Sequence, residues 1–336
     1  MTVLLLDDER FGLHDTGPHH PERAARLEAV RVGLSEHGLG DGLVRVEPRP
    51  ARDEELELVH PQRYVRSIES FCDAGGGHLD ADTVAVPASA AVARLAAGAG
   101  LSAVDALAEG DAAAAFVTAR PPGHHATATR AMGFCLFNNA AVTAAALAAR
   151  GERVLVVDVD AHHGNGTQDI FYERDDVAYV SWHQEPLYPG TGSKEQWGAG
   201  AGTGWTLNVP LPPGATGEHY RRSLEELVAP FAERHGSTWL VLSAGFDGHR
   251  ADPITDLGLT SGDYADITAD LVQLVAPGRV VVFLEGGYDL RAIADSSAST
   301  VAALLGDRLH PEAPTSGGPG AEQLEEVAAL RHQIDR

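Results

Sequence analysis

The chain has 336 residues, of which 44% are hydrophobic, so it is long enough to bury a large core. Its net charge of −23 argues against nucleic acid or an anionic membrane as a partner, and no apolar run approaches the roughly 18 residues of a membrane span. The apolar start, Val3 to Leu6, is too short for a secretory signal, and two cysteines support neither a disulfide framework nor a cysteine-based zinc site. We therefore expect a cytoplasmic protein.

Short β-branched segments alternate along the chain with amphipathic, alanine-rich segments. We predict strands at 2–6, 113–118, 153–159, 177–182, 238–244 and 279–285. We predict helices at 21–37, 61–73, 88–108, 138–149, 217–234, 261–274 and 290–305. Nearly continuous apolar strands that alternate with helices are typical of a parallel sheet covered on both faces. We predict a single α/β domain over residues 1–306 and a tail at 307–336 that contains a linker and a short helix.

Polar residues that could take part in catalysis or ligand binding follow four of the predicted strands. The four runs are FVTARPPGHHA (116–126), VVDVDAHH (156–163), LVLSAGFDGH (240–249) and VVFLEGGYDL (281–290). Because the carboxyl ends of parallel strands meet at one edge of a sheet, these runs are expected to border one ligand crevice.

The run after 153–159 has the residues of a metal site. In an extended chain Asp158, Asp160 and His162 project to one side and His163 to the other. Asp160 and His162 could hold one ion, with Asp247 as the third ligand. Two carboxylates and one imidazole with an open position are typical of a catalytic zinc or ferrous site. The alternative is a buried network of ion pairs and turns.

Two further motifs suggest proton transfer and charge stabilisation. His124 and His125 could take different roles if Asp158 and Asn165 orient them, because an imidazole bonded to a carboxylate is more basic than one bonded to an amide. Gly286 and Gly287 would let a loop bring the Tyr288 phenol to a developing oxyanion. Structural loops and a half-buried tyrosine are the plainer interpretation.

Several motifs together resemble the zinc-dependent histone deacetylases, in their class II branch with its bacterial deacetylase-like amidohydrolases. They are RPPGHHA (120–126), GFCLFNNAAV (133–142), DVDAHHGNGTQDIF (158–171), YPGTG (188–192), SAGFD (243–247) and LEGGYD (284–289). The resemblance covers about residues 10–305. It implies the arginase/deacetylase fold, with roughly eight parallel strands between helices and the active site at their carboxyl ends.

The resemblance also implies a role for each matching residue. Asp160, His162 and Asp247 match the ligands of one Zn²⁺, and Tyr288 matches the residue that stabilises the oxyanion. His125 matches the general base, oriented by Asn165, and His124, paired with Asp158, matches its electrostatic partner. A structural K⁺ would be held by Asp158, Asp160, His162, Ser181 and Trp182. Phe134 and Tyr188 match the walls of the acyl-lysine tunnel, Gly133 matches its floor, and Ile254 aligns with a residue at its mouth. Asp82 or Asp80 could be a rim carboxylate that holds a substrate backbone amide, or an ordinary loop acid.

The resemblance favours removal of an acyl group from acyl-lysine, in a peptide or protein, or from a small N-acyl amine. Binuclear manganese ureohydrolases share the fold but carry an Asp at the position of Gly164, so we expect one catalytic metal here. Acetylpolyamine hydrolases carry acidic residues at the tunnel mouth, where Ile254 is apolar. A non-catalytic acyl-lysine binder would lack a ligand, a histidine or the tyrosine. Assembly into a homo-oligomer stays open.

Overall fold

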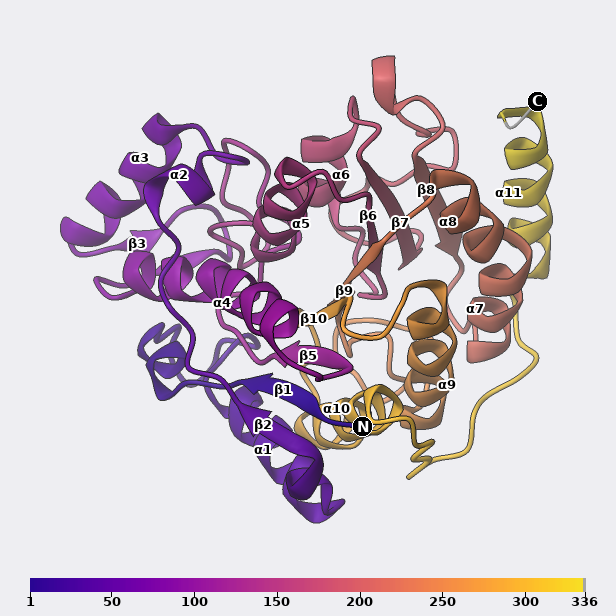
Figure 1. Ribbon diagram of the computed structural model, residues 1–336, viewed down its shortest axis with the longest axis horizontal. Helices are drawn as coiled ribbons and strands as arrows, with labels where there is room; N and C mark the ends of the chain where they lie inside the picture. The colour runs from indigo at the N-terminus through magenta and orange to yellow at the C-terminus, as the bar shows by residue number, and fades with distance from the viewer. Residues whose placement is uncertain (335–336) are drawn as a thin grey trace.

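Eight parallel strands form one sheet in the computed structural model, which describes residues 1–334 (Figure 1). In sheet order they are β2 (Leu43–Arg45), β1 (Val3–Leu6), β5 (Ala114–Val117), β10 (Val280–Leu284), β9 (Trp239–Ala244), β6 (Val154–Asp158), β7 (Val177–Gln184) and β8 (Thr206–Leu211). A separate hairpin pairs β3 (Gly77–His78) with β4 (Val84–Ala85). Valine and leucine dominate the central strands, which are buried along their whole length, and this confirms the predicted parallel α/β sheet.

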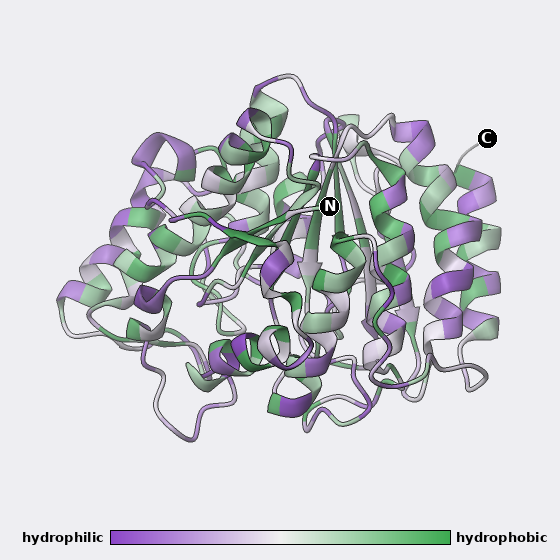
Figure 2. Ribbon diagram, turned by 60° about the horizontal axis from the view of Figure 1, so that its bottom comes forward, coloured by the Kyte–Doolittle hydropathy of each residue, from purple (hydrophilic) through white to green (hydrophobic). Residues whose placement is uncertain are grey.

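Helices cover both faces of the sheet (Figure 1). One layer holds α2 (Asp53–Leu56), α3 (Gln62–Asp73), α4 (Ser89–Glu109), α5 (Asn139–Ala149) and α6 (Asn165–Phe171). The other holds α1 (Ala25–Glu36), α7 (Gly217–Ser223), α8 (Ala229–His235), α9 (Ser261–Leu271) and α10 (Leu290–Leu304), with α11 (Ala321–Ile334) against the edge strand β8. Short 3-10 turns lie at Glu9–Leu13, Leu39–Gly42, Gly200–Gly202 and Val272–Leu274. In Figure 2 the strands are mostly hydrophobic, while the helices around them mix hydrophobic and hydrophilic residues.

Helix α4 is long and apolar enough, by length and composition, to cross a membrane. However, 72% of its most apolar stretch is buried inside the protein, and it packs against α5 and the strands β1, β5 and β10. The helix is therefore part of the core, and its apolar character exceeds what we expected from the sequence.

All six predicted strands are present, and four strands of the described residues were not predicted: the edge strands β2 and β8 and the hairpin strands β3 and β4. The edge strand β8 contains Asn208 and Pro210, which weaken the strand signal but are tolerated where no further strand has to pair. The helix predicted at 217–234 is divided by a π-helical segment, Leu224–Val228. Pro230 lies just beyond it and cannot donate the regular helical hydrogen bond, which accounts for the wider turn.

A buried ion-pair cluster ties the N-terminal segment to two loops at the carboxyl edge of the sheet. The Glu22 carboxylate accepts hydrogen bonds from Arg120 (2.7 Å) and Arg26 (3.0 Å), and all three side chains are fully buried. Arg26 also donates to the backbone carbonyl of Gly287 (2.6 Å), in the loop after β10. Burial alone would raise the pKa of Glu22, but the charges of the two arginines lower it to about 2.

Replacing Glu22 with Gln should lower the free energy of unfolding at pH 7 by about 3–5 kcal/mol, because two buried guanidinium groups lose their counter-charge. The folded-state pKa of about 2 lies below the ordinary 4.5, so this stabilisation is complete above pH 4.5 and is lost as the pH falls toward 2. Urea unfolding at pH 7 and pH 3 measures both effects. Glu226→Gln, which removes only an exposed partner of Arg222, is the control. If Glu22→Gln lowered the free energy of unfolding by the same amount at pH 7 and at pH 3, the lowered pKa of Glu22 would be contradicted.

Candidate active site

The four polar segments that follow β5, β6, β9 and β10 lie at one edge of the sheet. The strands β5, β10, β9 and β6 are adjacent in that order. Asp158 at the end of β6 lies opposite Ser243 of β9, and Ala244 lies opposite Leu284 of β10. The loops that follow therefore leave the sheet side by side, as the sequence predicts.

Asp160, His162 and Asp247 form a buried cluster whose ligand atoms all lie within 4.8 Å of one another. The His162 Nδ1 atom is 2.7 Å from Asp247 Oδ2 and 3.2 Å from Asp160 Oδ1. Backbone N–H groups fix the carboxylates from behind: Gly286 donates to Asp160 Oδ2 (2.8 Å) and Ala161 donates to Asp247 Oδ1 (2.8 Å). The cluster thus presents two carboxylates and one imidazole to a single point.

The charges of this cluster call for a cation. Asp160 and Asp247 are both fully buried, and their ion-pair partners are imidazoles, those of His162 and His124. Burial and the negative charge of Asp160 raise the pKa of Asp247 to about 7. Two adjacent buried carboxylates are costly unless a positive charge compensates them. The donor set fits Zn²⁺, for which two carboxylates and one imidazole leave room for water or substrate.

The histidine pair has the two partners that the sequence suggests. The Nδ1 atom of His124 lies 3.0 Å from Asp158 Oδ2, and Nδ1 of His125 lies 2.8 Å from Asn165 Oδ1. Burial opposes charge on His124, but Asp160 and Asp158 outweigh it and raise the pKa of His124 well above its usual range. Burial, together with the neighbouring His124 and His162, lowers the pKa of His125 well below it. With Nδ1–H donated to Asn165, Nε2 of His125 is left as a proton acceptor.

Tyr288 borders the same site from the loop after β10. Its ring meets Phe134 edge-on, with centroids 6.0 Å apart, and lies 5.3 Å from the Arg26 guanidinium carbon. Burial, with Asp247 nearby, raises the pKa of Tyr288 well above its usual range, so the phenol keeps its proton and is available as a donor.

A cavity of about 230 Å³ joins these groups to the surface. Its lining is Asp82, His125, Gly133, Phe134, His162, Leu187, Tyr188, Ile254 and Tyr288. Tyr188 and Ile254 are 41% and 39% exposed, which puts them at the mouth. Phe134 has a positive φ of 70°, a rare conformation for a bulky residue that is often found at functional sites. Of the residues predicted to contact substrate, Gly133, Phe134, Tyr188, Ile254 and Asp82 thus lie around one cavity, and Asp80 does not line it.

A larger residue at Gly164 would displace neighbouring buried side chains. A Cβ atom there would lie 2.0 Å from Asp158 Oδ2 and 2.6 Å from the Tyr179 hydroxyl. Tyr179 itself donates to the Gly164 carbonyl (3.0 Å). The side chains of Asp158 in β6 and Tyr179 in β7 therefore fill the space beside Gly164.

The remaining predicted residues lie close to the cluster without bordering the cavity. Ser181 is the register partner of Asp158, and Trp182 follows it in β7. The Ser181 hydroxyl lies 3.0 Å from His183 Nδ1, and the Trp182 indole donates to Ser223. A potassium ion at these residues stays a prediction. His163 turns away from the cavity and lies within hydrogen-bonding distance of Thr191 and Gln168, consistent with a structural role.

Sequence reasoning missed several residues that shape the site. Leu187 lines the cavity next to Tyr188. The Glu285 carboxylate accepts from the backbone N–H groups of Gly123 (2.7 Å) and His124 (3.2 Å), and so holds the histidine loop. Asp252 accepts from the backbone N–H of Tyr288 (2.7 Å). The charged residue Glu285 directly after an apolar strand was the one signal that could have been read.

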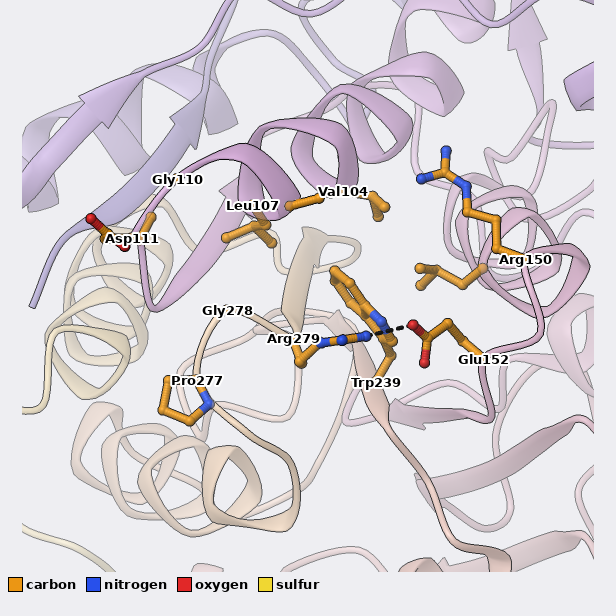
Figure 3. A pocket seen from close by; sticks show the side chains of 13 residues that line it. Val104, Leu107, Gly110, Asp111, Arg150, Glu152, Trp239, Pro277, Gly278 and Arg279 are labelled. Atoms are coloured by element: carbon orange, nitrogen blue, oxygen red, sulfur yellow. Dashed lines mark hydrogen bonds and ion pairs between the residues drawn. The ribbon is translucent and has the colours of Figure 1, made fainter.

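A larger hollow of about 530 Å³ lies near the amino ends of the strands, away from these residues (Figure 3). It is bordered by Trp239 at the start of β9 and by Arg279 just before β10. Arg279 donates to Glu152 (2.6 Å) and lies 5.1 Å from the Trp239 ring, so its charge is already balanced. The smaller cavity, which holds the metal-type cluster and the histidines, is therefore the candidate active site.

Comparisons with known proteins agree with this geometry. The histone deacetylase domain family matches residues 20–304. A probable deacetylase of Archaeoglobus fulgidus is 40% identical over 313 residues, which span 91% of this chain and 87% of that protein. A histone deacetylase-like amidohydrolase of Pseudomonas aeruginosa is 42% identical over 274 residues, 80% of this chain and 71% of that one. A crystal structure of an HDA15 HD domain matches with a TM-score of 0.91 at 35% identity, covering 99% and 94% of the two chains. The chain therefore belongs to the histone deacetylase family of amide hydrolases and has the arginase/deacetylase fold.

Proposed function

We propose that this protein is a zinc-dependent amidohydrolase that removes acyl groups, acetyl above all, from acyl-lysine side chains. One observation carries the proposal: His125, His162 and Tyr288 line a single narrow cavity, and His162 belongs to the buried metal-type cluster. The aromatic walls Phe134 and Tyr188 suit an extended aliphatic chain that carries an amide at its end.

The residues of the site divide the reaction among them. Zn²⁺, when bound by Asp160, His162 and Asp247, supplies Lewis-acid polarisation of water and of the substrate carbonyl. His125 accepts a proton as the water oxygen bonds to the carbonyl carbon, and Tyr288 donates a hydrogen bond to the oxyanion that results. His125 then returns a proton to the nitrogen as the C–N bond breaks, which releases an amine and a carboxylate. His124, held by Asp158, supplies positive charge beside His125.

Tyr288→Phe should lower kcat by about 10²–10³-fold, the usual cost of removing one oxyanion donor. The zinc content should stay unchanged, because Tyr288 lies outside the ligand cluster. Steady-state turnover of an acetyl-lysine peptide measures the effect. Tyr172→Phe, at the end of α6 and outside the cavity, is the matched control. Turnover of Tyr288→Phe close to that of the wild type would exclude this role.

The protein should bind one zinc ion per chain, and Asp247→Asn should lose both the metal and the activity. Chelation should abolish turnover and added Zn²⁺ should restore it, because the two buried carboxylates depend on the cation. Elemental analysis of purified protein gives the stoichiometry. Asp256→Asn, an exposed aspartate of the same loop, should retain the metal. Two transition-metal ions per chain would contradict the single-metal site.

A small N-acyl amine such as an acetylpolyamine is the second candidate substrate. Asp82 lines the cavity and Asp80 lies beside it, which favours a cation at the rim. Ile254 at the mouth is apolar and half-exposed, which favours the uncharged backbone of a peptide around the lysine.

We also propose that a structural K⁺ binds near Asp158 and Ser181 and that the protein is located in the cytoplasm.

Acetyl-lysine peptides should therefore give a higher kcat/KM than acetylpolyamines, and Ile254→Glu should shift this ratio toward the polyamines by about tenfold, worth about 1.4 kcal/mol of charge attraction. A panel of both substrate classes measures the ratio, with Ile254→Gln as the uncharged control. A wild-type preference for acetylpolyamines would make the second candidate the function. Absence of chelator-sensitive turnover on both classes would instead support a non-catalytic binder.

A further inference from the structure

The loop between β9 and α9, residues 245–260, carries three residues of the site. Asp247 belongs to the metal-type cluster, Ile254 lies at the cavity mouth, and Asp252 holds the backbone of Tyr288. The buried Asp252 carboxylate accepts from the N–H of Tyr288 through Oδ2 (2.7 Å) and from the N–H of Ile254 through Oδ1 (3.1 Å). Because Tyr288 follows two glycines, its backbone depends on such restraints.

The C-terminal tail crosses this loop. Residues 307–320 are irregular and run from α10 to α11, and Glu312 in their middle contacts the β9–α9 loop. Its carboxylate lies 2.6 Å from His249 Nε2 and accepts from the Arg250 guanidinium (2.5 Å). His249 is buried, and its Nδ1 accepts from the Ala251 N–H (3.1 Å), so the proton on Nε2 is the one donated to Glu312.

One more hydrogen bond completes a path from the tail to the site. The His249 carbonyl accepts from the N–H of Asp252 (2.8 Å). Glu312, His249, Asp252 and Tyr288 are therefore connected in series by three hydrogen bonds. The Arg250 side chain is 57% exposed, so its ion pair adds little, and the buried His249 contact carries the connection.

We propose that Glu312 is a positioning residue for Tyr288 and acts through His249 and Asp252. The inference rests on the proposed function, in which the Tyr288 phenol has to meet the substrate oxyanion. A misplacement of about 1 Å in a catalytic group can cost about 10²-fold in rate. Loss of the Glu312 carboxylate, which is connected to Tyr288 through three hydrogen bonds, should therefore lower turnover by loosening the backbone of Tyr288. The tail is thereby part of the catalytic unit.

The test uses the full chain with Glu312→Ala, Glu312→Gln and the control Glu325→Ala, an exposed glutamate of α11. Glu312→Ala should lower kcat on an acetyl-lysine peptide by about tenfold, with little change in KM or zinc content. Glu312→Gln keeps an acceptor for His249 and should recover most of the rate. The control should match the wild type.

A double mutant separates positioning from general loosening of the structure. If Glu312 acts through the phenol, Glu312→Ala should have no further effect on kcat in the Tyr288→Phe background. An equal loss of kcat in both backgrounds would show a structural role and overturn the inference. Glu312→Ala with the turnover of the wild type would also overturn it.

Amide hydrogen exchange tests the same connection without activity. The N–H of Tyr288 should exchange faster in Glu312→Ala than in the wild type, and at the wild-type rate in Glu325→Ala. An inactive wild type would refute the proposed function and leave this exchange measurement to decide the structural connection. Unchanged exchange at Tyr288 in a folded Glu312→Ala variant would refute the connection itself. If Glu312→Ala does not fold, Glu312→Asp shortens the side chain by one methylene group and weakens the contact with His249 Nε2, so the N–H of Tyr288 should again exchange faster than in the wild type, and unchanged exchange would overturn the inference.

Discussion

The structure of the site depends on two negatively charged carboxylates that lie next to each other in the protein interior. Asp160 and Asp247 lie in the loops that follow β6 and β9, are fully buried, and meet at the His162 imidazole. Such a pair is unfavourable unless a cation joins it, and each carboxylate is fixed by a backbone N–H from a neighbouring loop. Moving the loops apart would break these backbone hydrogen bonds and expose the carboxylates. The geometry of the cavity is therefore determined by the charges at its inner end.

The parallel sheet brings the two carboxylates and the histidines together. Four adjacent parallel strands end at the same level, so the connections that follow them bring together residues that are more than a hundred positions apart in the sequence, such as His125 and Tyr288. The cluster of Glu22, Arg120 and Arg26 then attaches the N-terminal segment to the same edge. The histidine loop, the tyrosine loop and the first helix are thus held by buried charge pairs as well as by apolar packing.

Strand ends could be predicted because they combine local signals: an apolar run, then aspartate, histidine or paired glycines. That pattern placed the metal-type cluster and the partners of His124 and His125 correctly, while the roles of these residues stay predictions. The pattern could not reveal Tyr179, Leu187 or Asp252, whose importance arises only from contacts across the fold. It also missed β8, an edge strand that contains a proline, and the π-helical segment before Pro230.

The contact between Gly164 and Tyr179 has a consequence for how this site could change over time. An aspartate introduced at position 164 would collide with both Asp158 and the Tyr179 hydroxyl before it could reach a second ion. The packing around Gly164 therefore opposes such a substitution, because the buried side chains of Asp158 and Tyr179 would both have to move to admit it. The side chains that fill the space beside β7 thereby limit which residues position 164 can accept.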